Sequence, residues 1–170
     1  MEKNMRKLAV VVLGCTLLGS TFLSAQKSPQ ASGKKIETLF KTAEIPFTSS
    51  EEGSYVAVIT VEEGESDRFH VYVSAIGNNP NDEKLQVVQL YFLLGQLPKD
   101  TPAPIALAKQ INEWNANLTV GKVVIVGSAI LYTSSSWLSR TDADGLAQDA
   151  VLGHYLSKDL RKEIAPYLKP

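Results

Sequence analysis

The chain of 170 residues has one cysteine and two histidines, and it has no excess of either charge. A single cysteine cannot form an internal disulfide, and no Cys/His cluster is present to hold zinc, so we expect neither a metal nor a cofactor. With 17 basic and 18 acidic residues, the chain also lacks the basic field of a nucleic-acid-binding protein. We therefore expect a small domain without disulfides or metal that does not bind nucleic acid.

The longest apolar stretch, residues 8–23, has 16 residues and is interrupted by five Gly, Ser and Thr residues. A membrane-spanning helix needs about 20 mainly apolar residues, so this stretch is too short for an integral segment. It follows Lys3, Arg6 and Lys7 and precedes small residues, which is typical of a secretory signal peptide. We therefore expect residues 1–25 to be a signal peptide cleaved after Ala25, and the mature protein to be periplasmic or secreted.

A second form of export competes with simple cleavage. The sequence Val-Leu-Gly-Cys that ends at Cys15 resembles a bacterial lipobox, in which the cysteine becomes the lipidated first residue. The chain stays apolar after Cys15, where a polar tether would be expected. A lipoprotein anchored through Cys15 thus remains the alternative to a soluble chain that begins at Gln26.

The first part of the mature chain is polar and then β-rich. Residues 26–35 are small and polar, which predicts a flexible linker, and residues 36–170 form a single domain that opens on a short helix over 36–44. Three strands are expected at Ser54–Glu62, 68–75 and 85–94, the first two joined as a hairpin. The run 85–94 is almost wholly apolar, so we expect a central strand that is covered on both faces.

The second part of the domain alternates helices with a further hairpin. An apolar stripe predicts a helix capped by Thr101 and a hairpin follows across Gly127-Ser128, with strands at Lys122–Val126 and 129–133. A long helix then runs from a capping box at Thr141 and Asp144 towards Pro166. The expected apolar residues are Leu107, Ile111, Trp114 and Leu118 on the first helix, and Leu152, Leu156, Leu160 and Ile164 on the last.

The element order is therefore α-β-β-β-α-β-β-α, which predicts an α+β domain in which helices flank an antiparallel sheet. No catalytic motif is present in the sequence, and we expect a protein that is not an enzyme. The alternative is a small envelope hydrolase whose site is assembled from distant residues such as His70, Asp67 and Ser134. A third interpretation is a lipid-anchored envelope protein with a structural role.

One segment, IALAKQINEWNANLTVGKVVIV at residues 105–126, resembles the YbjN family of bacterial sensory-transduction regulators. The matching residues are Asn112, Trp114, Asn115, Gly121 and Lys122. The resemblance implies a fold like that of the type III secretion chaperones and a non-enzymatic, regulatory or chaperone-like binding role. Two features depart from the family: most members have no export signal, and the hairpin after Lys122 is often acidic, whereas here it is apolar and serine-rich.

The family-motif residues also have a structural interpretation. Trp114 lies on the apolar stripe of its helix, where it would fill the core, and the two asparagines would bond backbone groups at the helix end. For partner binding, the strand over 129–137 is the best candidate for an open edge, and some of Ile130, Tyr132 and Trp137 should remain partly exposed as a patch. The partner would be a protein, a peptide or a second copy of the chain. Alternatively, the last helix covers the whole strand.

Overall fold

The computed structural model describes residues 30–50, 54–62, 65–76, 82–99 and 102–168. The predicted signal peptide, its cleavage site at Ala25 and the lipobox cysteine Cys15 lie outside the described residues. Within them, the chain forms three α-helices, six strands and three short 3-10 turns. Their bounds are α1 Gln30–Thr42, β1 Phe47–Ser49, β2 Ser54–Glu62, β3 Glu65–Ala75, η1 Glu83–Leu85, β4 Gln86–Gln96, α2 Ile105–Asn117, β5 Lys122–Val126, β6 Ala129–Trp137, η2 Leu138–Arg140, α3 Ala143–Ile164 and η3 Ala165–Tyr167.

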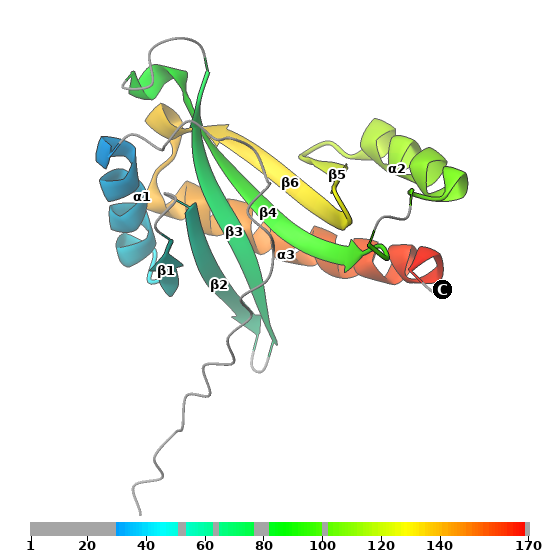
Figure 1. The fold of residues 1–170 in the computed structure, drawn as a ribbon. Helices are drawn as coiled ribbons and strands as arrows, with labels where there is room; N and C mark the ends of the chain where they lie inside the picture. The colour runs from blue at the N-terminus through cyan, green and yellow to red at the C-terminus, as the bar shows by residue number, and fades with distance from the viewer. Residues whose placement is uncertain (1–29, 51–53, 63–64, 77–81, 100–101, 169–170) are drawn as a thin grey trace, which may run out of the picture.

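The six strands form one antiparallel sheet in the order β1-β2-β3-β4-β6-β5. The helix α3 runs behind the sheet in Figure 1, α1 lies at the β1–β2 end, and α2 lies beside β5 at the other end. The predicted α+β class and the antiparallel sheet with flanking helices are confirmed. The expected element order also holds, apart from β1, a strand of three residues that the sequence pattern did not reveal.

One face of the sheet carries the hydrophobic core, and we call it the inner face. Period-two alternation places Phe69 and Phe92 on this face, where their rings stack with centroids 5.1 Å apart. Gly153 of α3 lies so close to the Phe92 ring that a Cβ atom there would clash with it. The helix therefore approaches the sheet at a glycine. At the other end, Phe40 of α1 packs against Tyr55 of β2.

The opposite face, which we call the outer face, carries the alternating side chains of the same strands. Along β4 the inner positions Val88, Leu90 and Phe92 are buried, whereas Leu93 on the outer side is 41% exposed. No helix of the described residues covers the outer side of the central strands (Figure 1). The expectation that the apolar run of β4 is covered on both faces is therefore wrong: β4 is central in the sheet, but only one of its faces is packed under a helix.

The helix boundaries differ from those expected from the sequence. The helix α1 begins at Gln30, so the linker predicted for residues 26–35 does not extend past residue 29, and the helix ends at Thr42, two residues before the predicted end. The helix α2 begins at Ile105 after Pro104, which makes no side-chain cap, so the predicted Thr101 cap is wrong. The cap of α3 is Asp142, whose carboxylate accepts from the Gly145 amide at 2.8 Å.

The buried stripe of α3 also differs from the expected leucine repeat. Leu160 and Ile164 are buried, but Leu152 is 40% exposed. Four residues advance a helix by about 400°, so a repeat of four drifts about 40° per step and carries Leu152 about 120° away from Ile164. The residues that face the sheet follow the helical period instead: Leu146, Ala150, Gly153, His154, Ser157, Leu160 and Ile164.

Candidate functional site

The segment that resembles the YbjN family has a structural role at the α2–β5 junction. The Asn115 side-chain amide donates to the Val123 carbonyl at 2.9 Å, and its oxygen accepts from the Val123 amide at 2.7 Å. Trp114 is nearly buried, and its indole N–H donates to the Glu163 carboxylate of α3 at 2.6 Å. The predicted structural interpretation is confirmed for these two residues. Asn112 is exposed on the same helix.

Gly121 and Lys122 follow at the start of β5. Gly121 has a φ of +72°, and a Cβ atom there would lie 2.6 Å from the Thr133 carbonyl oxygen. Any other residue would combine a strained backbone with a clash, so a glycine is required for this turn. The Lys122 side chain is exposed. The fold therefore accounts for Gly121, whereas it gives no structural reason for Lys122.

The three residues predicted to form an exposed patch are not together. Ile130 and Tyr132 are fully buried on the inner face of β6, and the Tyr132 hydroxyl donates to the Val120 carbonyl at 3.2 Å. The prediction of exposure is therefore wrong for Ile130 and Tyr132. Trp137 is 41% exposed, because side chains alternate along the strand and that of Trp137 points to the outer face, opposite to those of Ile130 and Tyr132.

The strand β6 is also not an open edge over most of its length. It lies between β4 and β5, and β5 pairs with it from Ala129 to Thr133. The rest of β6 extends past the end of β5. There the Thr141 hydroxyl donates to the Trp137 carbonyl at 2.8 Å, which fixes the backbone that carries the exposed indole. The serine-rich half of β6 therefore presents Trp137 at the surface, as the sequence pattern predicted for this one residue of the three.

Trp137 borders an open hollow of about 330 Å³ on the outer face. The register places Ser74, Val87 and Trp137 side by side across β3, β4 and β6. Ile76 lies beyond Ser74 and is 51% exposed. The wall of the hollow combines polar and apolar side chains. The polar ones are Ser74, Gln89, Ser135 and Ser136, and the apolar ones are Ile76, Val87 and Trp137.

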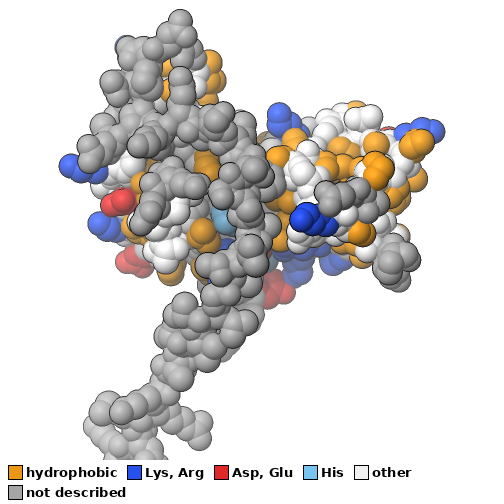
Figure 2. Space-filling model, in the orientation of Figure 1, with side chains coloured by type: hydrophobic (Ala, Val, Ile, Leu, Met, Phe, Trp, Pro, Cys, Tyr) orange, Lys and Arg blue, Asp and Glu red, His pale blue; other side chains and the backbone are white. Residues whose placement is uncertain are grey.

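Further apolar surface lies at the α2–β5 end. In Figure 2, hydrophobic side chains gather where Figure 1 places α2 and β5. Ile105 at the start of α2 and Val120 before β5 are exposed. Large apolar side chains that remain exposed on a monomer mark contact surfaces when they gather in a patch. The described surface thus offers apolar groups both around Trp137 and at this end.

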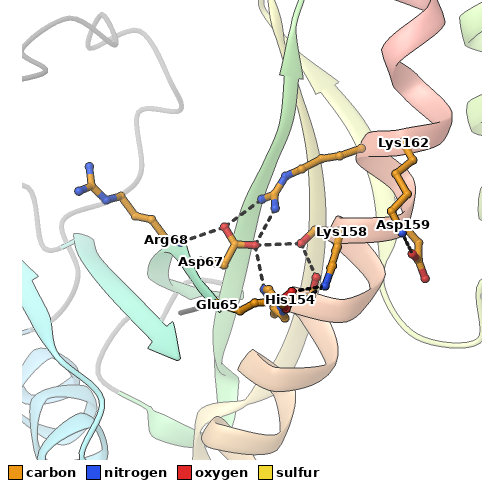
Figure 3. A network of polar contacts seen from close by, with 9 residues as sticks. Glu65, Asp67, Arg68, His154, Lys158, Asp159 and Lys162 are labelled. Atoms are coloured by element: carbon orange, nitrogen blue, oxygen red, sulfur yellow. Dashed lines mark hydrogen bonds and ion pairs between the residues drawn. The ribbon is translucent and has the colours of Figure 1, made fainter. Parts of the chain in front are cut away.

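The inner face carries a charged cluster between β3 and α3, shown in Figure 3. Arg161 of α3 donates to both oxygens of the Asp67 carboxylate, at 2.8 and 3.0 Å. Lys158 contacts Glu65 at 2.6 Å, and hydrogen bonding to this lysine lowers the pKa of the Glu65 carboxyl. The strand β3 begins at Glu65, three residues before the predicted start at residue 68, and it pairs there with β2; the ion pairs neutralise its two carboxylates.

His154 of α3 is buried within this charged cluster. Its Nδ1 atom lies 3.4 Å from Asp67 Oδ2, and its Nε2 atom lies 3.6 Å from Glu65 Oε2. At these distances neither nitrogen meets the geometry of a hydrogen bond with any of the described residues, and the contacts with the two carboxylates are electrostatic. The Ser157 hydroxyl donates to the Asp67 carboxylate at 3.3 Å and to the His154 carbonyl at 3.0 Å, not to the imidazole. A serine nucleophile needs a hydrogen bond to its base, so these three side chains are not arranged as a Ser-His-Asp triad.

The residues suggested for a hydrolase do not meet. Asp67 and Ser134 lie on the inner face, and the Ser134 hydroxyl is buried without a hydrogen-bond partner among the described residues. His70 lies on the outer face, where it pairs in register with Tyr91. Burial of the imidazole lowers the pKa of His70 below its ordinary value of 6.5, and the nearby Arg68 cation lowers it further. The sheet therefore separates the imidazole from the other two groups.

No family model matches the chain, and no curated protein matches it. The resemblance to the YbjN family therefore rests on the residues of α2 and β5. None of the helices within the described residues combines the length and hydrophobicity that crossing a bilayer requires.

Proposed function

We propose that the protein is a non-enzymatic, exported binding domain of the bacterial envelope, chaperone-like or regulatory in role, that binds a protein or peptide partner on the outer face of its sheet. The observation that carries this proposal is the exposure of Trp137 and Ile76 beside the hollow, on a sheet face that no described helix covers. Tryptophan is enriched among the residues that dominate protein–protein binding energy.

Two further observations support a binding role. The best-formed polar cluster, around His154, consists of ion pairs that fasten α3 to β3, and its serine hydroxyl is not directed at the imidazole. The imidazole of His70 is separated from Asp67 and Ser134 by the sheet itself. The resemblance to the YbjN family points in the same direction, because its members are regarded as regulators or chaperone-like binders.

The experiment compares the wild-type protein with the variant Trp137→Ser. We expect the variant to lose a crosslinked partner in the periplasmic fraction while its thermal unfolding stays unchanged, because the indole is on the surface. The matched control is Tyr155→Ser on α3, a similarly exposed aromatic residue on the other side of the molecule. A specific turnover by the purified protein that one side-chain change abolishes would contradict the proposal.

Export is tested separately by the intact mass of the protein from the envelope. A chain that begins at Gln26 supports cleavage after Ala25, and a species that begins at acylated Cys15 supports the lipoprotein. A cytoplasmic protein that retains Met1 would contradict export in either form.

A further inference from the structure

We infer that the outer face binds an extended, acidic segment of a partner protein, with an apolar side chain of that segment in the hollow beside Trp137. This inference rests on the proposed binding function and adds the chemistry of the partner. Three features of the described residues carry it: the sign of the charge on the outer face, the distance between its charged and apolar parts, and the lining of the hollow.

Among the described side chains of the strands, those on the outer face carry positive charge and no negative charge. Strand alternation directs the side chains of Arg68 on β3 and Lys122 on β5 to this face, and both are exposed. No described side chain at an outer position of the six strands is Asp or Glu, although the chain has 18 acidic residues. The strand carboxylates Glu65 and Asp67 point to the inner face, where α3 neutralises them.

His70 adds no charge to this face at neutral pH, because burial and Arg68 both lower its pKa. The imidazole instead belongs to an aromatic row with Tyr72 and Tyr91 that crosses the centre of the face. An anionic segment would therefore be attracted by Arg68 and Lys122, which flank this aromatic surface. Charge complementarity of this kind sets the choice of partner and the rate of encounter.

The spacing of these groups fits an extended chain. Lys122 pairs with Thr133 in register, and Trp137 lies four residues further along β6. At about 3.3 Å per residue, the distance from the cation to the indole along β6 is about 13 Å, the length of about four extended residues. The hollow of about 330 Å³ is wide enough for one large apolar side chain, and Gln89 and Ser135 in its wall offer hydrogen bonds to the backbone of such a segment.

Two other occupants fit this face less well. Two copies that meet through their outer faces would bring like charges together, which is unfavourable at an interface. A nucleic acid would also be attracted by cations, but binding to phosphates is carried by many basic residues, and the described strands place two on this face. The apolar side chains of the hollow, Ile76, Val87 and Trp137, add no attraction for a phosphate. A polypeptide segment uses both the cations and the hollow.

The test uses three fluorescent ten-residue peptides and the purified protein. The first alternates Glu with Leu and has one central Phe, the second has Lys in place of Glu, and the third has Ser in place of the apolar residues. We expect fluorescence anisotropy to show that the first peptide binds at least about tenfold more tightly than either of the others, the scale of two surface ion pairs or one seated aromatic side chain.

Variants locate the binding on the outer face. The double variant Arg68→Gln/Lys122→Gln and the single variant Trp137→Ser should each weaken binding of the first peptide about tenfold, the double variant with a loss of salt dependence. Lys109→Gln, an exposed lysine on α2, should leave binding unchanged. All of these side chains are on the surface, and thermal unfolding checks that each variant is folded.

The outcomes separate the inference from the proposed function. If the Glu and Lys peptides bind equally and Trp137→Ser abolishes both, the inference of an acidic partner is overturned. The proposal that the outer face binds a partner then still stands. Absence of binding by all three peptides, or binding that Trp137→Ser does not change, would overturn both. Concentration-dependent dimerisation that Trp137→Ser abolishes would assign the face to a second copy, and tighter binding of a single-stranded oligonucleotide would assign it to a nucleic acid; either result overturns the inference.

Discussion

The side chain of Asn115 at the end of α2 pairs with both backbone groups of Val123 in β5, accepting from its amide at 2.7 Å and donating to its carbonyl at 2.9 Å. An asparagine side chain here takes the place of a neighbouring strand. Because β5 is an edge strand of the sheet, this pairing satisfies backbone groups on its open side and fastens α2 to the sheet.

We therefore predict that Asn115→Ala destabilises the protein by about 1–2 kcal/mol, since two backbone groups of the buried Val123 lose their partners. Urea unfolding measures this change. The matched control is Asn112→Ala on the same helix, whose exposed side chain should matter by less than about 0.5 kcal/mol. Equal effects of the two substitutions would show that the loss reflects helix propensity rather than the pairing with Val123.

Trp114→Ala should destabilise the protein by about 3–5 kcal/mol, the usual loss for a large aromatic side chain in a core. Trp114→Phe keeps most of the packing but loses the hydrogen bond to Glu163, so about 1–2 kcal/mol is expected. Denaturant unfolding followed by circular dichroism gives both values. A loss below about 1 kcal/mol for the alanine variant would place this indole at the surface and revive a role for it in ligand contact.

The ion pairs between β3 and α3 differ in burial, which gives a matched test. Asp67 is mostly buried and makes a bidentate contact with Arg161, so Asp67→Asn should destabilise the protein by about 2–3 kcal/mol through loss of charged hydrogen bonds. Asp159→Asn breaks the exposed pair with Lys162 and should cause no measurable change. Thermal unfolding compares the two, and similar melting temperatures would contradict a role for Asp67 in holding α3.

The stability of the protein should depend on pH through His70. Because its pKa is lowered in the folded state, the folded protein holds this proton less tightly than the unfolded chain does. Above pH 6.5 the imidazole is neutral in both states and does not reduce stability. The free energy of unfolding should therefore fall as the pH drops below 6.5 towards the lower folded pKa, because the unfolded chain takes up the proton first.

His70→Gln removes this titration, so the difference in stability between variant and wild type should change between pH 7 and the folded pKa, in favour of the variant at low pH. Urea unfolding at a series of pH values measures the difference. A constant difference across that range would show that the imidazole is not desolvated in the folded protein.

The positions and types of most elements follow from local sequence. Alternation at Ser54–Glu62, the glycine turn at Gly127 and the apolar stripe of Leu107, Ile111 and Trp114 each act over a few residues, and each predicted its element. The same stripe also predicted that Trp114 fills the core, and the place of Asn115 predicted that it bonds backbone groups at the helix end. What local pattern determines is which backbone conformation a segment prefers and which of its faces is apolar.

The tertiary structure decided the surface and the candidate site. Whether Ile130, Tyr132 or Trp137 is exposed depends on which face of β6 the helix α3 covers, and a helix 22 residues long approaches the sheet where Gly153 allows contact with Phe92. Likewise, Glu65 and Asp67 belong to a strand rather than a turn, and Lys158 and Arg161, more than 90 residues later, neutralise them. Contacts between residues so distant in sequence leave no periodic signal in either segment, so only the folded chain brings them together.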